Sequence, residues 1–118
     1  MKTILVIEKH PNLRRLYVNS LSGIGYNVLT AWEPAQAREK IALGDPDLIV
    51  VDPRLGDEED ERSLSRLLDG DNLPPILYNL SSHGTGEGVG SLRTGYRLHK
   101  SSDIAQLERM VEVALPGR

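Results

Sequence analysis

Apolar runs alternate with amphipathic stretches along this chain, and the alternation predicts strands that alternate with helices. The clearest run is 48–51, where four apolar residues, mostly β-branched, lead directly into Asp52. A continuous apolar run of this length is typical of a strand buried on both faces, as in a parallel sheet covered by helices. Four more segments have strand character, and the last is so polar that we expect it at an edge of the sheet: 4–7, 26–31, 75–80 and 96–99.

Between these segments, apolar residues recur at the spacing of amphipathic helices. Helices are expected to begin at Pro11, at 33–34 and at the acidic run 57–61, and Gly23 and Gly44 mark the ends of the first two. The side chains expected to face inward are Leu13, Leu16, Tyr17, Leu21 and Ile24, then Ala37, Ile41 and Ala42, then Leu64, Leu67 and Leu68, and in the last helix Ile104, Leu107, Val111 and Ala114.

The segment 84–95 breaks this pattern because it is rich in glycine. A glycine inside a helix costs about 1 kcal/mol relative to alanine, so we expect a loop with at most one or two helical turns. The fourth helix is therefore expected to be short or irregular. Taken together, the strand–helix units predict a single domain spanning 1–118, with the α/β architecture of a (βα)5 doubly wound parallel five-stranded sheet of the flavodoxin-like kind.

Composition narrows the function classes. With 118 residues the chain can bury a core of its own, and a net charge of -3 with mixed signs gives no reason to expect nucleic acid as a partner. Cysteine is absent, which excludes disulfides and thiolate chemistry. No apolar stretch is long enough for a signal peptide or a membrane span, so we expect a cytoplasmic protein that does not bind membranes.

Polar residues follow the predicted strands at the points where ligands usually bind in open α/β sheets. They are Glu8 and Lys9 after the first strand, Asp52 after the third, Ser81 after the fourth and Lys100 after the fifth. A carboxylate, a hydroxyl and an ammonium at one edge suit the capture of a phosphoryl group. The carboxylate would act as nucleophile, and the other two groups would hold the transferred oxygens.

The chain resembles the receiver domain of bacterial two-component response regulators over essentially its whole length. The resemblance rests on the order and spacing of several pieces: 4–8 followed by Pro11, 25–28 with Ala31, 46–52 followed by Leu55, and then Ser81 and Lys100.

This resemblance implies that Asp52 is at the phosphoacceptor position and that Lys100 is the lysine that contacts the phosphoryl group. Ser81 falls at the hydroxyl position, although an extra residue in the fourth strand leaves Leu80 as an alternative. The implied Mg2+ ligands are Glu8, Asp52 and the backbone carbonyl of Arg54.

One departure from the family pattern concerns the metal. Receivers that bind Mg2+ carry two adjacent acids after the first strand, whereas this chain has Glu8 followed by Lys9. An ammonium cannot replace an oxygen ligand, so Mg2+ binding is expected to be weak or absent. Glu8 and Asp52 contribute −2 and Lys9 and Lys100 contribute +2, so the site would balance its own charge. Alternatively, Lys9 extends into solvent and the remaining acids still recruit Mg2+ weakly.

Three functions remain open at this stage. The first is a degenerate receiver, or pseudo-receiver, that acts as a signalling interaction module and binds a downstream protein, with a homodimer as a further expectation. The second is a working phosphoacceptor, phosphorylated on Asp52 by a histidine kinase or phosphotransfer protein. Such a domain is no enzyme beyond self-catalysed phosphoryl transfer and hydrolysis at Asp52. The third, a small-ligand binding module, rests on fold analogy alone.

Overall fold

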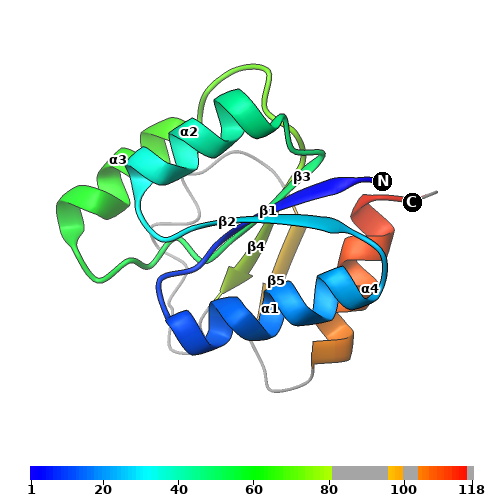
Figure 1. Ribbon diagram of the computed structural model, residues 1–118. Helices are drawn as coiled ribbons and strands as arrows, with labels where there is room; N and C mark the ends of the chain where they lie inside the picture. The colour runs from blue at the N-terminus through cyan, green and yellow to red at the C-terminus, as the bar shows by residue number, and fades with distance from the viewer. Residues whose placement is uncertain (81–95, 100–103, 117–118) are drawn as a thin grey trace.

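The computed structural model describes residues 1–80, 96–99 and 104–116, with strands and helices in alternation over most of the chain (Figure 1). The elements are β1 (Thr3–Ile7), α1 (Pro11–Gly23), β2 (Asn27–Ala31), α2 (Pro34–Gly44), β3 (Leu48–Val51), α3 (Glu58–Leu68), β4 (Ile76–Leu80), β5 (Tyr96–His99) and α4 (Ile104–Ala114).

The strands form one parallel sheet in the order β2-β1-β3-β4-β5. The predicted fold class is therefore confirmed, and β5 lies at an edge as expected. The glycine-rich stretch and the expected fourth helix fall within 81–95, outside the described residues. None of the described helices is long and apolar enough to cross a membrane.

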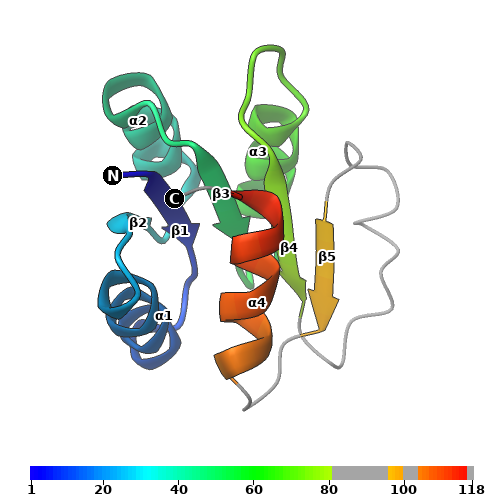
Figure 2. The ribbon, with the colours of Figure 1, turned by 90° about the vertical axis from the view of Figure 1, so that its right-hand side faces the viewer.

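The sheet separates two apolar clusters, with α1 and α4 on one face and α2 and α3 on the other (Figure 2). Side chains of the central strands alternate between these clusters. Ile4 and Val6 of β1 pack on the side of α1 and α4, whereas Leu5 and Ile7 pack on the side of α2 and α3. The continuous apolar run of β3 is explained in the same way, because both of its faces are covered.

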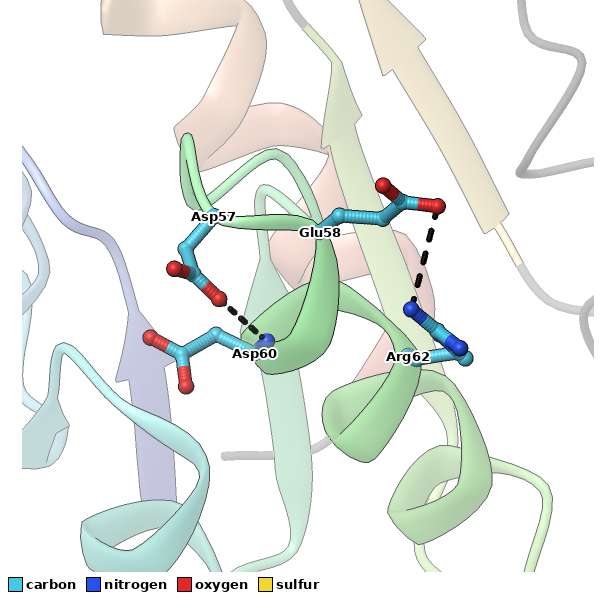
Figure 3. Close-up of polar contacts among 4 residues, drawn as sticks. All are labelled: Asp57, Glu58, Asp60 and Arg62. Carbon is cyan, nitrogen blue, oxygen red and sulfur yellow. Dashed lines mark hydrogen bonds and ion pairs between the residues drawn. The ribbon is translucent and has the colours of Figure 1, made fainter.

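The acidic run that begins α3 has the role expected of it at the positive end of the helix dipole (Figure 3). The carboxylate of Asp57 caps the helix by accepting a hydrogen bond from the backbone N–H of Asp60 at 2.9 Å. One turn later, Arg62 forms an exposed ion pair with Glu58 at 3.7 Å. These contacts account for the start of the helix.

Two of the expected inward positions are wrong. Leu16 is 43% exposed on α1, and Ala42 is exposed on α2. The buried residues of α1 are Tyr17 and Leu21, four apart and therefore on one stripe. Leu16 precedes Tyr17 by one residue, which rotates it by about 100° around the helix axis and away from the sheet.

Candidate functional site

Two carboxylates lie side by side at the carboxyl edge of the sheet. The register pairs Ile7 with Val51, and the next residue on each strand is an acid, Glu8 after β1 and Asp52 after β3. Both are buried, with exposed fractions of 2% and 5%. The backbone continues the pairing, because the N–H of Asp52 donates to the carbonyl of Ile7 at 3.1 Å. The structure thus brings together the two acids singled out from the sequence.

Each carboxylate is anchored by the backbone that follows it. The N–H of His10 donates to Oε2 of Glu8, and the N–H of Arg54 donates to Oδ1 of Asp52, both at 3.1 Å. Each bond spans two residues, so the chain turns sharply as soon as the strand ends. This local turn places Arg54, whose carbonyl the resemblance assigned to the metal, directly beside Asp52.

The loop between β3 and α3 is fixed by a carboxylate from the helix. Oε2 of Glu61 accepts hydrogen bonds from the backbone N–H groups of Leu55 and Gly56, each at 2.9 Å. Gly56 has φ of +83°, a left-handed conformation that favours glycine. Leu55 is buried against the apolar cluster on the α2 and α3 side. The loop that carries Asp52 into α3 is therefore held at its backbone and by its one buried side chain.

Lys9 reaches from the loop after β1 toward the loop after β3. Its side chain is exposed, and its Nζ lies 3.7 Å from the position that a Cβ on Gly56 would occupy. The positive charge lies over the loop that starts at Asp52.

A third buried polar residue stands in line with the two acids. The register pairs Val51 with Tyr78, so Asn79 is opposite Asp52, and its exposed fraction is 3%. The residues two positions earlier, Val6, Val50 and Leu77, all belong to the cluster under α1 and α4. Strand alternation therefore places Glu8, Asp52 and Asn79 on the same face of the sheet.

Asn79 was not recognised from the sequence, although a polar residue inside an otherwise apolar strand was available as a signal. Leu80, the next residue, packs against the cluster on the opposite face, under α2 and α3. Ser81 and Lys100, the predicted hydroxyl and ammonium, lie outside the described residues.

Two acids supply the side-chain oxygen atoms that could hold Mg2+ at this edge of the sheet. The ion prefers near-octahedral coordination by oxygen atoms. In the part of the chain that the structure describes, no group of three or more His, Cys, Asp or Glu side chains is placed to hold a metal ion. The acids at the edge are Glu8 and Asp52, and the neighbouring position carries the cation of Lys9.

Comparison with known proteins gives relatives by structure only: no family model matches the chain and no curated protein matches it. The N-terminal domain of a response regulator/sensory box/GGDEF 3-domain protein from Carboxydothermus hydrogenoformans is 29% identical with a TM-score of 0.79, and the match covers 97% of this chain and 94% of that one.

Two further structures share the fold at lower identity. The response regulator TrrA from Thermotoga maritima, solved with Mg2+ and BeF, is 24% identical with a TM-score of 0.80, covering 98% of this chain and 100% of that one. The chemotaxis response regulator CheY4 of Vibrio cholerae is 19% identical with a TM-score of 0.81, covering 98% and 99%. The likeness extends over nearly the whole chain in each case.

Proposed function

We propose, from the premise that this chain is a receiver domain of the response-regulator type, that it acts in two-component signalling as an interaction module whose site binds Mg2+ weakly or not at all. The observation that carries this proposal is the position of Lys9. It follows Glu8 where the family pattern has a second acid, and its ammonium lies over Gly56, in the loop that begins at Asp52.

The charges around the site support this reading. Two buried carboxylates on neighbouring strands need compensating positive charge. A divalent cation would supply that charge in a receiver that binds Mg2+. Here Lys9 supplies part of it from the chain itself, and the resemblance assigns the rest to Lys100. A site balanced in this way has no need of metal and favours one resting state.

The partner that we propose is a protein. Histidine kinase ThkA has been solved in complex with response regulator TrrA, a structure in which the matching chain is 23% identical to this one with a TM-score of 0.76. By analogy we propose a histidine kinase, a phosphotransfer protein or a downstream protein as the partner here. A second copy of the chain is a further candidate.

The second candidate function is a working phosphoacceptor. It is favoured by Asp52, which stands at the carboxyl edge of the sheet with Oδ1 anchored by the N–H of Arg54. A carboxylate fixed in this way is oriented for nucleophilic attack on a phosphoryl group. In this reading Lys9 would slow the reaction without preventing it.

Intact-mass measurement after incubation with a small-molecule phosphodonor and Mg2+ separates the two functions. We expect the wild type to gain no phosphoryl group and Lys9→Asp to gain one. The double variant with Asp52→Asn, which removes the nucleophile, should gain none. A wild-type protein that gains a phosphoryl group dependent on both Mg2+ and Asp52 would overturn the interaction-module proposal in favour of the phosphoacceptor.

Thermal stability gives an independent test of the role of Lys9. Lys9→Asp places a third carboxylate near Glu8 and Asp52, and like charges at a few ångströms repel by about 1–4 kcal/mol, with the lower end expected at this exposed position. The variant should melt below the wild type in chelator. Mg2+ should then raise the free energy of unfolding of the variant by about 2.7 kcal/mol at a hundredfold excess over its Kd.

The matched control is Lys2→Asp, which makes the same change in net charge just before β1, at the opposite end of the sheet. The change in melting temperature that Mg2+ causes in this control should be the same as in the wild type. If Mg2+ raises the melting temperature of the wild type and of Lys9→Asp equally, Lys9 is not the residue that weakens metal binding.

A further inference from the structure

The loop that carries Glu8 and Lys9 is held from outside by a side chain of α1. Nη1 of Arg14 donates to the backbone carbonyls of Glu8 at 2.9 Å and of Lys9 at 3.2 Å. The backbone N–H of the same residue donates to the carbonyl of His10 at 2.9 Å, in the first turn of α1. Three successive carbonyls of the loop are therefore bound by one residue.

An aromatic ring also contacts the guanidinium of Arg14. Cζ of Arg14 lies 4.6 Å from the centroid of the Trp32 ring, a cation–π contact. Trp32 follows β2, and its backbone N–H donates to Oε1 of Gln36 on α2 at 2.9 Å. The planar guanidinium binds the loop carbonyls and contacts the ring at the same time, which is an arrangement that arginine provides and lysine reproduces poorly.

The side chain of Lys9 starts from this fixed backbone. A lysine side chain has a flexible four-carbon stem and, on an exposed loop, samples many conformers. With the carbonyls on either side of its Cα fixed by Arg14, the Cα–Cβ direction of Lys9 is set, and its Nζ reaches Gly56 across the site. The orientation of Lys9 thus depends on Arg14, which binds the backbone on both sides of it.

We propose that Arg14, supported by Trp32, is a positioning residue that keeps the Lys9 ammonium over the loop after Asp52 and so keeps divalent cations from the site. This inference rests on the proposed function, because it explains how Lys9 opposes the metal. A purely structural Arg14 would stabilise the loop and leave Mg2+ affinity unchanged. Under the proposal, loss of Arg14 raises Mg2+ affinity, and it does so only while Lys9 is present.

A double-mutant cycle tests this, with Mg2+ as the probe and the amide shifts of Gly56 and its neighbours as the readout. We expect Arg14→Ala to lower the apparent Kd for Mg2+ about three- to tenfold relative to the wild type, tenfold being worth about 1.4 kcal/mol. In the Lys9→Asp background the same substitution should change the Kd by less than about twofold. This difference between the two backgrounds would show that Arg14 and Lys9 are coupled, because the effects of independent residues add.

Arg15→Ala is the matched control, because Arg15 is exposed on the same helix turn and carries the same charge. It should leave the Kd within about twofold of wild type, as expected of an exposed charge screened by solvent.

Trp32 is the one tryptophan of the chain, so its fluorescence reports the Arg14 contact directly. The emission should change in Arg14→Ala and stay as in the wild type in Arg15→Ala. If Arg14→Ala does not fold, Arg14→Lys keeps the charge, weakens the contact with the ring and should shift the Kd in the same direction.

The outcomes separate the two proposals. Tight Mg2+ binding by the wild type contradicts the proposed function. Weak binding by both the wild type and Arg14→Ala, with tight binding by Lys9→Asp, preserves the proposed function and overturns the positioning role. An equal gain from Arg14→Ala in both backgrounds also overturns it, since the effect would then come from the charge of Arg14 alone.

Discussion

Replacing Glu61 is expected to loosen the loop that leads from Asp52 into α3. Its Oε2 accepts the backbone N–H groups of both Leu55 and Gly56 at 2.9 Å, so one carboxylate satisfies two donors. Leu55 is buried, with an exposed fraction of 1%, whereas Gly56 is exposed. The consequences of the substitution should therefore differ between the two amides, because water can replace the partner of Gly56 but reaches Leu55 less easily.

The magnitude follows from the number and type of bonds lost. A hydrogen bond to a charged group contributes about 1.5–3 kcal/mol, and solvent exposure lowers this value for Gly56. Glu61→Ala should therefore reduce the free energy of unfolding by about 2–3 kcal/mol, which includes about 0.5 kcal/mol for the lost negative charge at the helix start. Glu61→Gln keeps an acceptor oxygen and should lose about 1 kcal/mol.

Urea unfolding followed by circular dichroism measures these free energies, and amide hydrogen exchange locates the change. Glu59→Ala is the matched control, because Glu59 lies in the same first turn of α3 but is exposed. The control should cost about 0.5 kcal/mol from the helix dipole. The reasoning fails if Glu61→Ala costs no more than Glu59→Ala, or if the exchange of the Leu55 amide is unchanged.

Three further substitutions test the surrounding geometry by the same unfolding measurement. Gly56→Ala should cost about 1–2 kcal/mol because of the left-handed φ of +83°, and a neutral result would mean that the loop adopts another conformation in solution. Asp57→Ala removes the cap of α3 and should cost about 1 kcal/mol, whereas Asp57→Ser should retain most of the stability. Asn79→Leu should be nearly neutral or stabilising, because it replaces a buried carboxamide with an apolar side chain of similar size. A loss above about 2 kcal/mol would show that this carboxamide has a strong partner in the site.

Much of the fold could be predicted because its signals are local. The apolar run of β3 and the acid that ends it are adjacent in the sequence, and both faces of that strand are covered in the structure. The end of α2 was also predictable: the helix stops at Gly44, and the next residue, Asp45, adopts a left-handed φ of 44°. Leu16 was misjudged for the opposite reason, because the width of the buried stripe on α1 depends on which elements cover it.

The site residues also fall into two groups, those that local sequence signals predict and those that depend on how distant segments pack. Glu8 and Asp52 were predictable since each polar residue directly follows an apolar run, and parallel strands bring such ends together. Asn79 required the register between β3 and β4, which the sequence does not contain. The roles of Arg14 and Glu61 also escaped prediction, because each arises from a helix side chain that reaches back to a loop.

Arg14 and Glu61 have corresponding roles in the two loops that flank the site. The loop after β1 exposes carbonyl oxygens, and the guanidinium of Arg14 binds two of them. The loop after β3 exposes N–H groups, and the carboxylate of Glu61 binds two of those. Each loop is thus fixed by a side chain of the helix that follows it, with a charge of the right sign.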